Sequence, residues 1–166
     1  ELRMILKNLN KNFLVNLLLI LLIFILDRFS KIYVIYLDKK FVGSEIFSSN
    51  FLNINLIWNK GIAFGFFSAN ETTFYNILTF IIMLVILFVF YLLTRSNGFK
   101  KFALLMIFSG AIGNLFDRII YRAVPDFIDF HVGSFHWFIF NIADVFITIG
   151  VFFMILIEIF VKDEKN

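Results

Sequence analysis

The sequence predicts a mainly α-helical, polytopic membrane protein with four transmembrane helices and a small extracytoplasmic β-sheet resting on the membrane. Hydrophobic residues make up 61% of the 166 residues, and the mean hydropathy of +0.92 is too high for a soluble domain of this length. Four apolar stretches each run for roughly 20 residues, the length that crosses about 30 Å of hydrocarbon. The connections between them are polar or mixed, so the chain alternates between spans and exposed segments.

Each predicted span is an apolar run bounded by polar or charged positions. The four runs cover residues 13–36, 74–94, 102–120 and 140–161, and the longer connections cover residues 37–73 and 121–139. The first run has no small-residue cleavage site, so we expect it to be retained as a span. No internal repeat or linker is present, which predicts a single domain over residues 1–166. We expect translation to begin at Met4.

The basic residues predict how the spans are oriented. They precede the first span, join the second to the third and follow the fourth: Arg3, Lys7, Lys11, Arg95, Lys100, Lys101, Lys162 and Lys165. The positive-inside rule therefore places both termini in the cytoplasm and the two longer connections outside. This topology also explains the net charge of +3, so we expect no nucleic-acid partner.

The first outer connection contains a strand pattern. Between residues 51 and 58, Asn53 and Asn55 alternate with apolar neighbours, which predicts a half-buried strand in a small sheet. The aromatic segment from Gly61 to Phe67 continues it, either as a strand or as an interfacial segment whose rings lie at headgroup level.

Two carboxylates, Asp126 and Asp144, stand just before and just inside the last span. Ionisable groups at the edge of a span are unfavourable and usually mark function. A close carboxylate pair shares one proton and activates water, as in aspartic proteases. Pro125 disfavours helix just before it, which allows the chain to bring Asp126 back toward Asp144. The alternative is two separate interfacial carboxylates, and Asp129 competes with Asp126 for the second role.

Other polar residues share helix faces with these spans. Asn141 lies three residues before Asp144 in the predicted fourth span, so both side chains point the same way. In the third span, small residues that permit close helix contact precede Asn114, which shares a face with Asp117 and Arg118. Asp117 and Arg118 have two interpretations. Either both cap and anchor the helix at the interface, or Arg118 positions a carboxylate or a lipid phosphate.

Two further positions are open to structural or chemical interpretations. Asp27 and Lys31 lie four residues apart in the first span, which predicts an ion pair that ties this span to the sheet. Asn59 is expected either to form a turn or to hydrogen-bond the backbone of a substrate.

The two histidines do not predict a metal site. His131 and His136 lack a His-Glu-x-x-His pattern and a third ligand at a suitable spacing, and the chain has no cysteine. Ser134 is not in a Gly-x-Ser-x-Gly turn, and we expect it to share one strand with the histidines. We therefore expect neither a metal nor another cofactor.

Five ordered motifs resemble the lipoprotein signal peptidases, or signal peptidase II, of bacterial inner membranes. They cover most of the chain and read Asp27-Arg28-Phe29-Ser30-Lys31, Asn59-Lys60-Gly61-Ile62-Ala63-Phe64, Gly110-Ala111-Ile112-Gly113-Asn114-Leu115-Phe116-Asp117-Arg118, Val124-Pro125-Asp126-Phe127 and Phe140-Asn141-Ile142-Ala143-Asp144. The sequence departs from the family pattern at Ser30, where threonine is usual, and at Lys60 and Ile62, where small residues are commoner.

The resemblance implies a membrane-embedded aspartic endopeptidase with Asp126 and Asp144 as its catalytic dyad. The implied supporting residues are Asp27, Lys31, Asn59, Gly61, Asn114, Arg118 and Asn141. The implied substrate is a diacylglyceryl-modified prolipoprotein, cut on the N-terminal side of the lipidated cysteine at the outer face of the inner membrane. Membrane lipids and globomycin-type cyclic peptide inhibitors are the other implied partners, and we expect a monomer.

Composition alone favours a noncatalytic membrane protein, either a transporter subunit or an assembly scaffold. Transport is disfavoured because the acidic residues cluster at one end instead of forming a relay at the midplane, and because no inverted-repeat spans are visible.

Overall fold

The computed structural model has the predicted fold class and describes residues 2–41, 45–61 and 71–163. Its elements are α1 (Leu2–Phe41), β1 (Phe47–Ser48), β2 (Leu52–Asn59), α2 (Glu71–Arg95), α3 (Gly98–Tyr121), β3 (Val124–Val132), β4 (Phe135–Phe140) and α4 (Ile142–Asp163). Each of the four helices is long and apolar enough to cross a membrane. The first three extend past the predicted spans at both ends, whereas α4 begins at Ile142 instead of Phe140.

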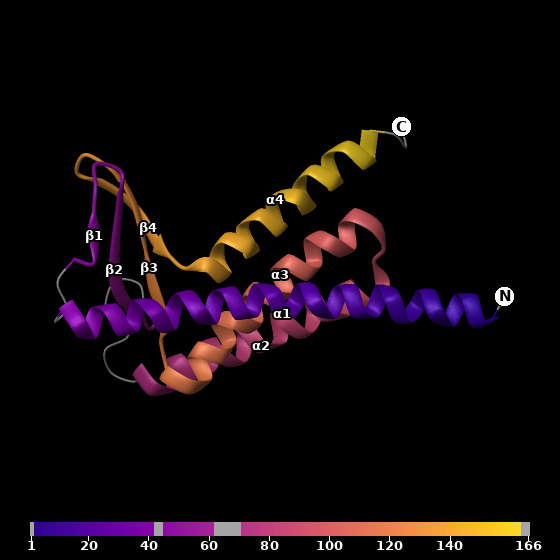
Figure 1. The fold of residues 1–166 in the computed structure, drawn as a ribbon, viewed down its shortest axis with the longest axis horizontal. Coiled ribbons are helices and arrows are strands. Elements are labelled where there is room, and N and C mark those ends of the chain that lie inside the picture. The colour runs from indigo at the N-terminus through magenta and orange to yellow at the C-terminus, as the bar shows by residue number, and fades with distance from the viewer. Residues whose placement is uncertain (1, 42–44, 62–70, 164–166) are drawn as a thin grey trace.

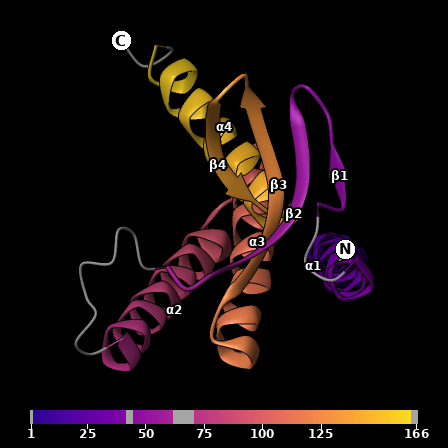
Figure 2. The same cartoon turned by 90° about the vertical axis from the view of Figure 1, so that its left-hand side faces the viewer.

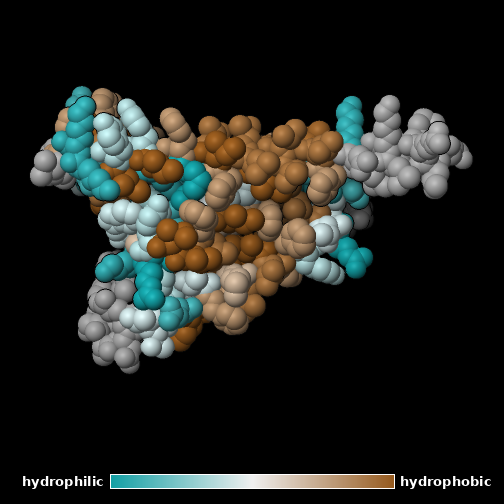
Figure 3. All heavy atoms as spheres, turned by 60° about the horizontal axis from the view of Figure 1, so that its bottom comes forward, coloured by the Kyte–Doolittle hydropathy of each residue, from teal (hydrophilic) through white to brown (hydrophobic). Residues whose placement is uncertain are grey.

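The helices form a bundle with the sheet at one end. Figure 1 shows the N-terminal end of α1 and the C-terminal end of α4 at the opposite end from the strands. The central element is α3, which packs against α1, α2 and α4 and is the most buried of the four helices. Hydrophobic residues form a broad band over the helices, with hydrophilic residues toward the two ends (Figure 3). This distribution suits a bundle whose sides face lipid.

Glycines allow α3 and α4 to approach closely. A Cβ atom on Gly110 would lie 2.5 Å from the backbone oxygen of Ala143, and one on Gly150 would lie 2.7 Å from that of Ala103. Lipid-exposed helices gain little from burying apolar surface against one another, so close contact through small residues contributes much of their association. The prediction that the small residues of the third span permit close helix contact is confirmed.

The sheet joins the two long connections of the chain. Its four strands are antiparallel in the order β1-β2-β3-β4 (Figure 2). β2 confirms the strand predicted over residues 51–58, and it pairs with β3 so that Ile57 faces Asp126 and Asn59 faces Val124. Because β3 follows α3 after only two residues, Asp126 lies close to the end of the central helix.

The second connection is a hairpin that was not predicted from the sequence. β3 ends at Val132 and β4 begins at Phe135, with Gly133 and Ser134 in a turn where Gly133 has φ +60°. A positive φ is readily adopted by glycine, which explains the turn at this position. The expectation that Ser134 and both histidines share one strand is therefore wrong, since His131 lies on β3 and His136 on β4.

Part of the predicted outer segment lies outside the described residues. Gly61 lies two residues after the end of β2 and is the last described residue before position 71. The aromatic positions Phe64, Phe66 and Phe67, and the substitution Ile62, fall in the range 62–70, so the choice between a strand and an interfacial segment stays a prediction.

Candidate active site

Asp126 is a buried carboxylate near the start of β3. Only 3% of the residue is exposed, and both oxygens accept hydrogen bonds: Oδ2 from Asn59 Nδ2 at 2.9 Å and Oδ1 from Asn141 Nδ2 at 2.6 Å. Burial raises the pKa of Asp126 above its usual value, and the negative charge of Asp144 raises this pKa further. The two amide donors and the positive charge of Lys31 oppose this shift without cancelling it. Asp126 is thus suited to keep a proton.

Asp144 has a different environment in the first turn of α4. It is partly exposed, and its oxygens accept from Asn114 Nδ2 at 2.7 Å and from the backbone N–H of Asn141 at 3.1 Å. The N-terminus of a helix favours negative charge because its first N–H groups point outward along the axis. Partial solvent access, two hydrogen-bond donors and the helix terminus give this carboxylate a more polar environment than that of Asp126.

Asn141 connects the two carboxylates. Its side-chain amide donates to Asp126, its backbone N–H donates to Asp144, and its Oδ1 accepts from the backbone N–H of Asp144 at 3.1 Å. The reciprocal bonds between Asn141 and Asp144 form a capping box at the start of α4. Asn141 is therefore the N-cap residue of α4 and lies just outside the helix. The sequence had placed it inside the fourth span. One asparagine fixes where both carboxylates lie.

Asn114 on α3 extends the same network toward α1. Its Oδ1 accepts from Lys31 Nζ at 3.0 Å and from Asn141 Nδ2 at 3.2 Å, while its Nδ2 donates to Asp144. Because the oxygen of Asn114 has two donors as neighbours, the nitrogen must face Asp144. Lys31 thereby determines how a neutral amide is presented to the carboxylate.

Lys31 belongs to a cluster of two cations and two anions, in which Lys31 and both carboxylates are buried and the second cation, Arg28, is partly buried. Its Nζ lies 2.8 Å from Asp27 Oδ1 and 2.6 Å from Asp117 Oδ2. Arg28 forms a two-pronged ion pair with Asp117 and a 2.6 Å contact with Asp27. Charges withdrawn from water are tolerated when they are paired and hydrogen-bonded, and this cluster is balanced.

The cluster corrects two predictions. The ion pair between Asp27 and Lys31 exists, but its hydrogen bonds go to α3 and to the start of α4, where the backbone N–H of Ala143 donates to Asp27 at 3.1 Å, and not to the sheet. Asp117 is fully buried in this cluster and is not an interfacial cap. Sequence reasoning had not selected Arg28 for the site, although a charge inside an apolar span was a signal for it.

Arg118 and Gly61 lie beside this region. Arg118 Nη1 donates to Asn114 O at 3.5 Å, and its Nε is buried without a hydrogen-bond partner among the described residues. A Cβ atom on Gly61, whose φ is +72°, would lie 2.6 Å from a methyl group of Leu78 and 3.9 Å from the guanidinium of Arg118. The backbone N–H of Gly61 donates to Asn59 Oδ1 at 2.7 Å, so Asn59 does form the predicted turn and also binds Asp126.

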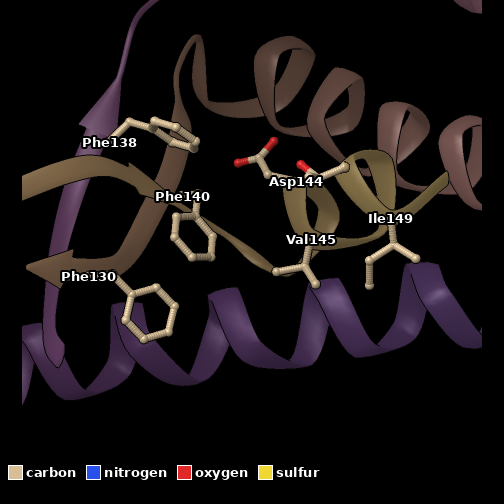
Figure 4. Close-up of a pocket in the computed structure, with 7 residues that line it drawn as sticks. Phe130, Phe138, Phe140, Asp144, Val145 and Ile149 are labelled. Carbon is tan, nitrogen blue, oxygen red and sulfur yellow. The ribbon is translucent and has the colours of Figure 1, made fainter. Parts of the chain in front are cut away.

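An apolar pocket of about 300 Å³ opens beside Asp144. Figure 4 shows the carboxylate next to aromatic rings from the sheet and aliphatic side chains from α4. The lining residues are Phe130, Phe138, Phe140, Asp144, Val145, Thr148 and Ile149. A polar reacting group at the edge of an apolar hollow is typical of sites that bind a mostly apolar ligand in one orientation.

Asp129 lies apart from these groups. Its carboxylate contacts His136 Nδ1 at 2.9 Å and Asn53 Nδ2 at 3.5 Å. Side chains alternate between the two faces of a strand, so residues 126 and 129 of β3 project to opposite faces. It is Asp126 that contacts Asn141, and Asp129 does not join this network among the described residues.

Most of the chain is similar to known peptidases. A family model described as Signal peptidase (SPase) II matches residues 19–160. A lipoprotein signal peptidase of Pelagibacter ubique is 47% identical over 156 residues, which cover 94% of each protein. One from Anaplasma marginale is 39% identical over 150 residues, covering 90% of this chain and 86% of the relative.

Solved structures show the same fold. A bacterial membrane enzyme determined at 2.3 Å by the in meso method matches with a TM-score of 0.69 and 31% identity, covering 92% of both chains. A second bacterial membrane enzyme, determined at 1.9 Å, matches with a TM-score of 0.67 and 35% identity over 86% of this chain and 90% of the other.

Proposed function

Because the chain belongs to the signal peptidase II family, whose activity is to remove signal peptides from lipoproteins, we propose that it does so by aspartic-protease chemistry at Asp126 and Asp144. The observation that carries the proposal is that Asn141 hydrogen-bonds both carboxylates while one is buried and the other is partly exposed. Two close carboxylates in unlike environments are the arrangement in which a single proton is shared unequally.

The proposed reaction begins with Asp126 protonated and Asp144 ionised. Asp144 takes a proton from a water molecule, whose oxygen attacks the carbonyl carbon of the scissile peptide bond. Asp126 donates its proton to the carbonyl oxygen, which gives a neutral tetrahedral intermediate. When the C–N bond breaks, the amine nitrogen takes the proton that Asp144 holds, and the hydroxyl proton of the intermediate returns to Asp126. The resting protonation states are thereby restored.

The proposed substrate is a diacylglyceryl-modified prolipoprotein, cut on the N-terminal side of the lipidated cysteine. The apolar pocket beside Asp144 suits uncharged side chains of the signal peptide next to the scissile bond. The acyl chains of the substrate would stay in the bilayer, which holds the peptide at the depth of the carboxylates. Anchoring of this kind replaces much of the entropic cost of encounter.

The orientation of the chain follows from its charges. We place the end of the bundle that carries the chain termini in the cytoplasm, because the basic residues flank the helices there. The sheet, Asp126 and Asp144 then face outward, where signal peptides emerge from the membrane. A tag on either terminus should not react with a membrane-impermeant label in intact cells. Labelling of a terminal tag from outside would contradict the proposed orientation.

The activity is tested with the pure protein and a synthetic precursor. The full chain in detergent or liposomes should convert a diacylglyceryl-modified precursor into a signal peptide and a product that begins with the lipidated cysteine, as determined by mass spectrometry. The same precursor without its lipid is the matched control and should be cut far more slowly. A noncatalytic scaffold would cleave neither at any protein concentration.

A further inference from the structure

A second group of polar side chains lies on the β3–β4 hairpin, outside the network around Asp126 and Asp144. We propose that Asp129, His131 and His136 bind a divalent transition-metal ion of the Zn²⁺ type. Each of the three offers one ligand atom, and these atoms lie within 4.8 Å of one another. Imidazole nitrogens with one carboxylate oxygen are a frequent ligand set for Zn²⁺.

The β3–β4 hairpin brings together three residues that form no metal-binding motif in the sequence. Asp129 and His131 are two apart on β3, so they share one face of the strand. His136 is the Cα partner of His131 across the hairpin, and the two rings stack with centroids 4.9 Å apart and planes 20° from parallel. The sequence spacing offered no third ligand to the two histidines, whereas the turn at Gly133 and Ser134 brings Asp129 and both histidines together.

The surroundings of the three side chains also favour a cation. Asp129 is buried, and its carboxylate is already directed at His136 Nδ1 at 2.9 Å. His131 Nδ1 is buried and has no hydrogen-bond partner among the described residues. A buried polar nitrogen without a partner is destabilising, so a bound ion would remove that cost.

The distances require only small side-chain movements. Zn²⁺ binds nitrogen and oxygen at about 2.0–2.1 Å, so two ligands of one ion lie at most about 4 Å apart. Rotations of the two imidazole rings would close the remaining gap. The side chain of His136 is 49% exposed, which leaves an open direction for a water molecule as fourth ligand.

The inferred site is separate from the proposed catalytic pair. Asp126 and Asp129 project to opposite faces of β3, so an ion at Asp129 would not contact the reacting water. It would instead join the end of β3 to the start of β4, the strand that carries two aromatic residues of the pocket, Phe138 and Phe140. The inference therefore does not depend on the proposed reaction.

Zn²⁺ binding to the untagged full-length protein tests the inference. After treatment with a chelator, the protein in detergent is dialysed against increasing Zn²⁺ and its metal content is measured. We expect one ion per chain, and a tetrahedral absorption spectrum when Co²⁺ replaces Zn²⁺. The variants His131→Ala and His136→Ala should bind at least tenfold more weakly, whereas Val132→Ala, an exposed neighbour on β3, should bind like the original protein.

His131→Phe separates metal binding from folding. It keeps an aromatic ring stacked on His136 but removes both nitrogens, of which Nδ1 has no hydrogen-bond partner to lose among the described residues. This variant should unfold at the original temperature without metal and lose the rise in that temperature that Zn²⁺ gives the original protein. Absence of stoichiometric binding by the folded protein, or equal binding by His131→Phe, would overturn the inference.

Discussion

The side-chain amide of Asn141, the residue before α4, donates a 2.6 Å hydrogen bond to Oδ1 of Asp126 on β3. The same residue caps α4 through its reciprocal bonds with Asp144. Asn141 is therefore both a helix cap and the link between two carboxylates, and these two roles make different demands on its side chain.

Substitutions at Asn141 should separate the two roles. Asn141→Ala removes the cap and the donor to Asp126, so it should lower stability by about 1 kcal/mol and reduce cleavage at least tenfold. Asn141→Ser keeps a good N-cap residue but loses the amide donor, so it should be more stable than Asn141→Ala and still lose cleavage. Thermal unfolding and single-turnover cleavage measure the two effects. Asn55→Ala, on β2, is the control. Full activity in Asn141→Ser would show that the donor to Asp126 is dispensable.

Removal of Asn59 should shift the pH dependence of cleavage. Burial raises the pKa of Asp126, and the hydrogen bond from Asn59 partly opposes that shift by stabilising the ionised form. Asn59→Ala should therefore raise this pKa further. Because the proposed reaction needs Asp126 protonated, activity is lost as the pH rises through this pKa, and the alkaline limb of kcat/KM should move to higher pH. Lys60→Ala, at the exposed neighbouring position, is the control. If the alkaline limb of Asn59→Ala lies at the same pH as in this control or lower, Asp126 is not the protonated group of the reaction.

Loss of Lys31 should destabilise the bundle. Lys31→Met has a similar shape but leaves the buried carboxylates of Asp27 and Asp117 paired with the partly buried Arg28 alone among the described residues. Breaking a buried ion pair by removing one partner costs about 3–5 kcal/mol, since the other charge stays away from water. The unfolding temperature in detergent should fall clearly for Lys31→Met and remain unchanged for Lys60→Met, whose side chain is exposed. Equal unfolding temperatures would mean that the cluster adds little stability.

The sequence was most informative where one physical signal dominated. Length and hydropathy predicted all four spans, and alternation around Asn53 predicted β2. The motifs also selected the polar residues that the fold gathers near α3. These features depend on local chemistry, which neighbouring residues largely determine.

The errors arose where tertiary structure decided between similar local patterns. The apolar run from Phe135 into α4 hides a change from strand to helix, and only the capping box at Asn141 and Asp144 marks the boundary. The hairpin turn is only two residues long, but Gly133 followed by Ser134 is a known hairpin signal that the prediction did not use. The partners of Asp27 and Lys31 on α3 could not be read from spacing within α1, because they depend on how the helices pack.

The most direct test of the central claim is cleavage of a lipidated precursor by purified Asp126→Asn and Asp144→Asn. Asparagine keeps the shape of each side chain but can neither accept the proton of water nor donate an acidic proton. Each variant should remain folded in the membrane and lose at least a hundredfold in cleavage rate, the range expected when a general acid or base is removed. Turnover close to that of the original protein in either variant would contradict the proposed aspartic mechanism.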